Sequence, residues 1–309
     1  MTGIHHVTAI AGDSARNLNF YKRDLGLRFV KKTVNFDDPS TYHFYYGDAT
    51  GSPGTILTFF VWPGAKAGSP GGGEVHQTAF RVPLSSLDYW TKRLTERGIP
   101  CQAMETRFGE QVLPFSDPDG MRLMLTGVAG TESEPAWSYG DIPKEYAIRG
   151  FHGATLVLDS AEETGAILTD VLGFREVDRE GALIRFAASG GANGCLIDIH
   201  EKKGLTRGHQ GRGSVHHIAF RAADDTQQAM IADKLISGHQ RHPTEQKDRN
   251  YFRSIYFREP GGVLFEIATD IPGFAVDESV DLFGQNLKLP SFLEARRREI
   301  ESVLPVLED

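Results

Sequence analysis

Two pairs of adjacent histidines, His5-His6 and His216-His217, lie in short apolar runs, and Glu266 lies in a third such run. Adjacent residues of a β-strand point to opposite faces, so only one histidine of each pair can face a given cavity. Two imidazoles and one carboxylate on one side of a metal ion leave coordination positions open. Non-heme Fe(II) enzymes use this arrangement to bind substrate and O2 together. The residue types therefore allow a metal site if the fold brings them together.

The sequence contains an internal repeat, which indicates the elements that must position these residues. The run Gly3-Ile-His-His-Val-Thr-Ala-Ile is similar to Gly150-Phe-His-Gly-Ala-Thr-Leu-Val, and Val75-His-Gln-Thr-Ala-Phe-Arg is similar to Val215-His-His-Ile-Ala-Phe-Arg. Each run is rich in apolar and β-branched residues and is followed by a polar turn and a helical pattern. The sequence therefore predicts an α+β fold of four βαβββ modules, which we expect to pair into two open barrels.

The repeat also separates the two histidines of each pair. The first histidine is present in all four modules, as His5, His76, His152 and His216. The second histidine and the glutamate are each replaced elsewhere, and the residues at the corresponding places are Gly153, Gln77, Met124, Thr58 and Asp198. A residue found in every copy is typical of module architecture, whereas one found in few copies indicates a specialised site. We therefore predict that His6, His217 and Glu266 bind the metal, that modules one and four share the cavity, and that modules two and three form its degenerate twin.

The boundaries of the modules follow from turn and loop residues. We expect the modules at residues 1–63, 76–127, 150–201 and 214–270, followed by a C-terminal extension at 271–309. Gly- and Pro-rich stretches separate the modules, as is typical of loops. The helices are expected after an Asp13-Ser14 cap, over 84–97, before Leu172-Gly173, over 226–237 and over 291–304.

Composition limits the class of protein. Of the 309 residues, 40% are hydrophobic and 24% charged, which is typical of globular chains, and no apolar run of about 18 residues could span a bilayer. A net charge of -8 without a basic run argues against nucleic acid as a partner. The two cysteines, Cys101 and Cys195, cannot form a disulfide framework, and the first predicted strand begins too early for a signal peptide. We therefore expect a cytoplasmic protein, with the oligomeric state, including a homo-oligomer, left open.

Over nearly its whole length the chain resembles the vicinal oxygen chelate superfamily, and within it the ring-cleaving dioxygenases that act on hydroquinones and related phenols. The most specific motifs are Gly3-Ile-His-His-Val-Thr, Ala147-Ile-Arg-Gly-Phe-His-Gly-Ala-Thr, Val215-His-His-Ile-Ala-Phe and the segment from Asp248 to Glu266. The resemblance implies that the second histidine of each pair and the final glutamate are the metal ligands. It also implies a small aromatic substrate, O2 as co-substrate and Fe(II) as the metal, with Mn(II) as the alternative.

The same resemblance suggests roles for Tyr256, ten residues before Glu266, and for Arg249, seven residues before Tyr256. Tyr256 can hydrogen-bond a phenolate oxygen of the substrate, and Arg249 can stabilise anionic charge on the ring. Arg249 could equally be a solvated loop charge. His216, His5 and Tyr256 are the candidate proton donors, and the sequence does not rank them.

Two other functions stay open, because one fold can host several chemistries. A glyoxalase-type metal-dependent isomerase or lyase would favour Zn or Ni and usually a fourth protein ligand, for which Thr58 is a poor substitute. A non-catalytic aromatic-binding or drug-resistance protein would need the cavity but no metal.

Overall fold

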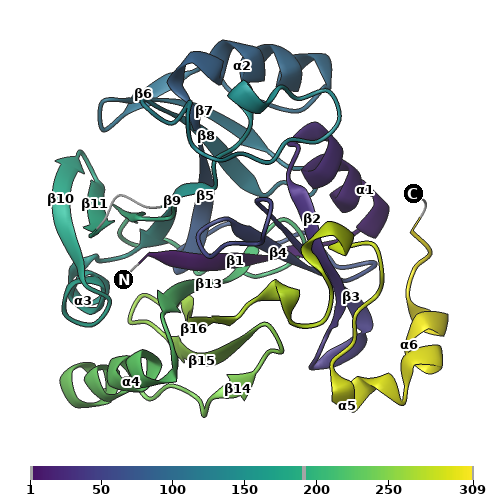
Figure 1. The fold of residues 1–309 in the computed structure, drawn as a ribbon. Coiled ribbons are helices and arrows are strands. Elements are labelled where there is room, and N and C mark those ends of the chain that lie inside the picture. Colours follow the sequence, from purple (N-terminus) through teal and green to yellow (C-terminus); the bar gives the residue numbers. More distant parts are fainter. Residues whose placement is uncertain (1–2, 190–192, 308–309) are drawn as a thin grey trace.

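Two eight-stranded sheets form the centre of the computed structural model, which describes residues 3–189 and 193–307 (Figure 1). The first sheet has the strand order β14-β15-β16-β13-β1-β4-β3-β2, and the second has the order β10-β11-β12-β9-β5-β8-β7-β6. Each sheet therefore combines the strands of two βαβββ units. The predicted fold class, an α+β fold of four such modules in two paired, curled sheets, is confirmed.

The first sheet is built from the two ends of the chain. Its N-terminal elements are β1 (Ile4–Ala11), α1 (Ser14–Leu18), the π-helical turn η1 (Asn19–Asp24), β2 (Arg28–Asn35), β3 (Asp38–Gly47) and β4 (Ile56–Val61). Its later elements are β13 (Val215–Ala222), α4 (Asp225–His239), β14 (Lys247–Asp248), β15 (Phe252–Arg258) and β16 (Leu264–Pro272). The antiparallel pair β1–β13 joins the two halves, while β1–β4 and β13–β16 are parallel.

The second sheet repeats this plan with the middle of the chain. Its first half contains β5 (Glu74–Pro83), η2 (Leu84–Ser86), α2 (Leu87–Glu96), β6 (Glu105–Arg107), β7 (Glu110–Ser116) and β8 (Arg122–Val128), followed by the turn η3 (Lys144–Tyr146). Its second half contains β9 (Phe151–Leu158), α3 (Glu162–Ala166), η4 (Ile167–Val171), β10 (Phe174–Glu180), β11 (Leu183–Ala188) and β12 (Leu196–Glu201). Here the antiparallel pair β5–β9 takes the place of β1–β13.

Local sequence signals account for the helix ends of the first sheet. The Asp13 carboxylate accepts a hydrogen bond from the backbone N–H of Arg16 and so caps α1, and Asp224 caps α4 through the N–H of Gln227. Gly26, with φ of +73°, provides the left-handed turn between η1 and β2. None of the helices in the described ranges is long and apolar enough to cross a membrane.

The C-terminal segment differs from the single helix predicted over 291–304. It forms two short turns, η5 (Phe274–Val276) and η6 (Val280–Leu282), and then two short helices, α5 (Ser291–Glu294) and α6 (Arg297–Val303). Tertiary contacts at both ends hold this segment against the N-terminal module beside β3 (Figure 1). The Phe292 ring lies 6.0 Å from that of Phe36, and the Tyr42 hydroxyl donates to the carbonyl of Pro305 at 3.0 Å.

A buried lysine ties the extension to the wall of the first sheet. Lys31 on β2 is fully buried, and its Nζ donates to Asp277 Oδ1 and Glu278 Oε1, each at 2.6 Å, and to the carbonyl of Phe274 at 3.1 Å. An ammonium group taken out of water needs such partners, and removing one side of a buried ion pair leaves the other charge uncompensated.

We therefore expect Lys31→Met to lower the free energy of unfolding by about 3 kcal/mol, as measured by urea denaturation. The matched control is Lys92→Met on α2, where the side chain is exposed and lies 3.8 Å from Glu96, so little change is expected. Equal urea midpoints for the Lys31 variant and the wild type would show that the buried contacts of Lys31 do not contribute to stability.

Candidate metal centre

Three side chains converge on one point inside the first sheet. His6 comes from β1, His217 from β13 and Glu266 from β16, and all three are buried. The Oε2 atom of Glu266 lies 2.8 Å from Nε2 of His217 and 3.3 Å from Nε2 of His6. Within the described ranges, this is the one group of three histidine, cysteine or acidic side chains whose ligand atoms lie within 4.8 Å of one another.

The strand register explains the convergence. In the antiparallel pair β1–β13, His6 is opposite Ala219 and Thr8 is opposite His217, so the two histidines are diagonal neighbours on one face. In the parallel pair β13–β16, Ala219 is opposite Glu266. Ala219 therefore lies between His6 and Glu266 on the same row. Its methyl group takes little room, which leaves space for the three longer side chains to meet.

The surroundings of Glu266 fit a cation. Its Oε1 accepts a short hydrogen bond from the Ser254 hydroxyl. Its buried Oε2 has no hydrogen bond of good geometry to any described residue, although two imidazole nitrogens lie near it. Burial alone would raise the pKa of Glu266, but His6 and His217 outweigh it and hold that pKa well below its usual range. A buried carboxylate oxygen without a donor, facing two Nε2 atoms, is the donor set that a divalent metal with N and O ligands requires.

The first histidine of each pair supports the second. Nδ1 of His6 lies 2.9 Å from Nδ1 of His5, and Nδ1 of His217 lies 2.8 Å from Nδ1 of His216. Burial lowers the pKa of His5 well below its ordinary value and lowers that of His216 to about 3, so both are neutral at pH 7. Each can then accept a hydrogen bond from the Nδ1–H of its neighbour, which leaves the Nε2 lone pairs of His6 and His217 directed at the centre.

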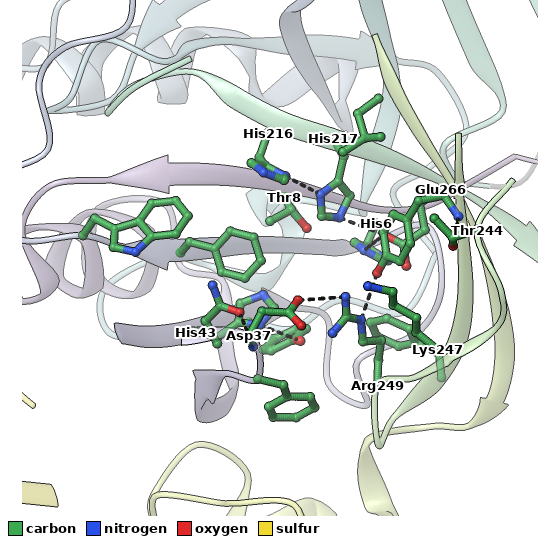
Figure 2. Close-up of a pocket in the computed structure, with 18 residues that line it drawn as sticks. His6, Thr8, Asp37, His43, His216, His217, Thr244, Lys247, Arg249 and Glu266 are labelled. Carbon is green, nitrogen blue, oxygen red and sulfur yellow. Dashed lines mark hydrogen bonds and ion pairs between the residues drawn. The ribbon is translucent and has the colours of Figure 1, made fainter. Parts of the chain in front are cut away.

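The centre opens into a cavity of about 340 Å³, and Arg249 lies in its wall (Figure 2). Tyr256 also lines this cavity. Tyr256 is opposite Glu266 in the antiparallel pair β15–β16. Nε of Arg249 donates to the Tyr256 hydroxyl at 3.1 Å, and Nη2 of Arg249 donates to Asp37 at 3.1 Å. Burial raises the pKa of Tyr256 above its ordinary value. The structure thus places Arg249 in the cavity wall, where it is not a solvated loop charge.

His216 and His5 occupy different places. His216 lines the cavity beside His217, although opposite faces were expected for adjacent strand residues. His5 does not line the cavity and packs behind His6, with its ring 5.2 Å from Phe252. Among the three candidate proton donors, Tyr256 and His216 therefore reach the cavity. His5 contacts the metal centre through its hydrogen bond to His6.

Among its described residues, the second sheet has no equivalent donor set. Gly153 and Met124 replace the ligands, and a Cβ atom on Gly153 would lie 2.4 Å from the carbonyl oxygen of Leu196. The remaining polar groups neutralise one another, since Arg185 binds Asp198 through two hydrogen bonds at 2.8 and 2.9 Å and also donates to Glu110. His152, the first-position histidine of the third module, contacts Glu110 rather than a second histidine. The histidines at the first position of the four modules therefore do not share one architectural role.

Sequence reasoning missed several cavity residues. Asp37 lies in the connection between β2 and β3, and His43 lies on β3. Trp62 follows β4, and Lys247 lies on β14. None of them stands out by contrast with the other modules. One usable signal was His43, a lone polar residue in the aromatic run from Tyr42 to Tyr46.

Several known proteins are similar to this chain in sequence and in fold. The profile of the Glyoxalase/Bleomycin resistance protein/Dioxygenase superfamily matches residues 3–125 and 150–267. A Bacillus subtilis (strain 168) protein named provisionally as the ring-cleaving dioxygenase MhqO is 45% identical over 98% of this chain and 95% of its own length. The chlorohydroquinone/hydroquinone 1,2-dioxygenase of Sphingobium indicum is 33% identical over 96% of this chain and 94% of its own length.

Solved structures agree with this similarity. The crystal structure of a provisionally assigned dioxygenase from Bacillus subtilis has a TM-score of 0.94 and 44% identity, and the match covers 99% of this chain and 97% of that chain. Glyoxalase I from Zea mays has a TM-score of 0.65 and 14% identity, covering 87% of this chain and 93% of that chain. At that identity the plant enzyme shows a shared fold alone.

Proposed function

The chain belongs to the Glyoxalase/Bleomycin resistance protein/Dioxygenase superfamily, and from this premise we propose that it is a metal-dependent dioxygenase that opens the ring of a hydroquinone or catechol with O2. The observation that carries the proposal is the buried Oε2 of Glu266, which faces His6 and His217 at the base of an aromatic-lined cavity. A cavity near 340 Å³ lies in the range of small-molecule sites, about 300–1,000 Å³.

We propose that His6, His217 and Glu266 hold Fe(II), with Mn(II) as the alternative, because ligand identity separates these two metals poorly. When bound, the metal would supply open coordination positions and the redox chemistry that couples the diphenol to O2. A glyoxalase-type centre usually adds a fourth protein ligand. Thr58 does not serve as one, because its hydroxyl contacts His43 at 2.8 Å and Thr8 at 2.9 Å.

The protein side chains bind the ring and position protons. Phe60 and Trp62 line the cavity and can pack on an aromatic ring. Tyr256 accepts a hydrogen bond from Arg249 and can still donate its own hydroxyl proton to a substrate oxygen, and burial raises its pKa so that this proton stays in place. Neutral His216, with its Nδ1 taken by His217, carries its proton on Nε2 and is a second donor at the cavity wall.

The proposed activity is tested by loading the protein with Fe(II) under anaerobic, reducing conditions and adding O2 with a panel of hydroquinones and catechols. We expect O2 uptake in step with loss of the aromatic absorbance and formation of an open-chain acid. Metal-free protein is the control. If no diphenol supports O2 uptake while methylglyoxal with a thiol is isomerised, the dioxygenase proposal is wrong and the glyoxalase alternative replaces it.

Tyr256→Phe is expected to keep the metal and to lower kcat/KM for the diphenol by about 10- to 100-fold, because it removes one positioned hydroxyl and no ligand. Steady-state O2 uptake and metal analysis measure the two effects. The matched control is Tyr251→Phe, whose buried hydroxyl donates to Asp277 outside the cavity at 2.9 Å. Equal activity losses in the two variants would assign the Tyr256 effect to packing.

A further inference from the structure

A chain of four polar side chains runs through the wall of the first sheet toward the metal centre. The Tyr45 hydroxyl lies 3.0 Å from Nδ1 of His43, Nε2 of His43 lies 2.8 Å from the Thr58 hydroxyl, and Thr58 lies 2.9 Å from Thr8. These residues come from β3, β4 and β1, and Thr58 is opposite both Thr8 and Tyr45 in the strand register. The chain is therefore built by three neighbouring strands.

The direction of each hydrogen bond in this chain follows from counting protons. Thr58 donates its single hydroxyl proton to Thr8, so it must accept from Nε2 of His43. Burial lowers the pKa of His43 well below its ordinary value, so the ring is neutral and carries its one proton on Nε2. Its Nδ1 is then an acceptor for the Tyr45 hydroxyl. With the Thr58 hydroxyl donating to Thr8, one arrangement of protons satisfies all three bonds.

Thr8 is the end of this chain and lies at the centre. It is two residues after His6 on the same face of β1, and it is opposite His217 on β13. Thr8 is fully buried, lines the cavity and accepts from Thr58, and Figure 2 shows it beside the histidines. Among the described residues, no hydrogen-bond acceptor is found for its own proton. Because Thr8 lines the cavity, this proton is available to a substrate oxygen bound there.

The His43 ring packs against two aromatic rings. Its centroid lies 4.2 Å from the Tyr45 ring and 4.5 Å from the Phe60 ring, and both neighbours also line the cavity. Hydrogen bonds in a chain polarise one another in a low-dielectric interior, so a fixed donor at one end strengthens the donor at the other.

We propose that His43 is a positioning residue that acts through Thr58 to present the Thr8 hydroxyl as a hydrogen-bond donor to an oxygen atom of the bound diphenol. The inference rests on the proposed function, since it requires an aromatic hydroxyl or phenolate at the metal centre. Thr58 occupies the place in module one that corresponds to Glu266 in module four. In this proposal Thr58 binds no metal and orients the substrate indirectly, through Thr8.

A double-mutant cycle tests the proposal, because a residue that acts only through Thr8 has no effect once the Thr8 hydroxyl is absent. We expect Thr58→Val to lower kcat/KM by about 3- to 10-fold with unchanged metal content, as for loss of one hydrogen bond. In the Thr8→Val background, the same change should have no further effect. Thr58→Ser keeps a hydroxyl at this position and should therefore retain the activity of the wild type. The control is Thr126→Val in the second sheet, which removes a buried hydroxyl that has no hydrogen-bond partner in the described part of the chain.

A second measurement separates this proposal from the activity itself. The same cycle is run on the binding of phenol to the metal-loaded protein, followed by the fluorescence of Trp62 at the cavity wall. If the wild type turns over no diphenol, the proposed function fails, while non-additive losses of phenol affinity still support the chain. Additive effects in the cycle, loss of metal from Thr58→Val, or the absence of phenol binding to the wild type would each overturn the inference.

Discussion

Glu266→Gln is expected to lose the metal ion and, with it, measurable ring-cleaving activity. The change keeps the shape of the side chain and leaves an oxygen for the Ser254 hydroxyl, but it puts a neutral group where a buried carboxylate faces His6 and His217. Removal of an outer hydrogen-bond partner typically lowers metal affinity by about 10- to 100-fold, and loss of a charged ligand should exceed that.

The measurement that does not depend on activity is the metal-induced rise in Tm. A metal that binds only the folded state stabilises it, so Fe(II) or Mn(II) should raise the Tm of the wild type and leave that of Glu266→Gln unchanged. Asp198→Asn is the matched control, because it removes a buried carboxylate that binds Arg185 in the second sheet. It should lower the Tm without affecting the metal-induced rise. A normal rise in Glu266→Gln would reject the centre.

The three candidate ligands could be predicted because the four modules of the chain can be compared with one another. The four modules share strand patterns, so Gly153 and Gln77 mark the places where a histidine is dispensable to the fold. The structure brings together the three residues that this contrast selected. The metal itself is a chemical inference from the donor set and stays a prediction.

The rest of the cavity could not be predicted in this way. Asp37 and Lys247 reach it because the connection after β2 and the short strand β14 fold over the same opening, and no local pattern encodes that meeting. The contacts of the first-position histidines of the four modules could not be predicted from the sequence either. His76 lies beside Arg122 and Glu74, whereas His216 lies beside His217, although the same residue type recurs at the same place.

Arg249→Met is expected to lower kcat/KM for the diphenol by about 100-fold while the metal stays bound, as for removal of one positioned charged donor. Arg249 donates through Nε to Tyr256 and through Nη2 to Asp37, so it joins the two halves of the cavity wall. Its loss would remove a positive charge beside an anionic ring and free the Tyr256 hydroxyl to turn. Arg249→Lys should recover little activity, because an ammonium group cannot make both bonds of the planar fork.

The control for Arg249 is Arg253→Met, which removes an arginine on β15 that pairs with Asp225 outside the cavity. It should leave kcat/KM unchanged, since the pair is largely at the surface. Comparing kcat with KM then shows what Arg249 does. A rise in KM alone would mean that Arg249 binds substrate and transition state equally, whereas equal falls in kcat and kcat/KM would mean that its charge acts on the transition state. Full activity in Arg249→Met, or an equal loss of activity in Arg253→Met, would show that Arg249 has no specific role at the site. The anionic ring would then have to be stabilised by the metal, Tyr256 and His216 alone.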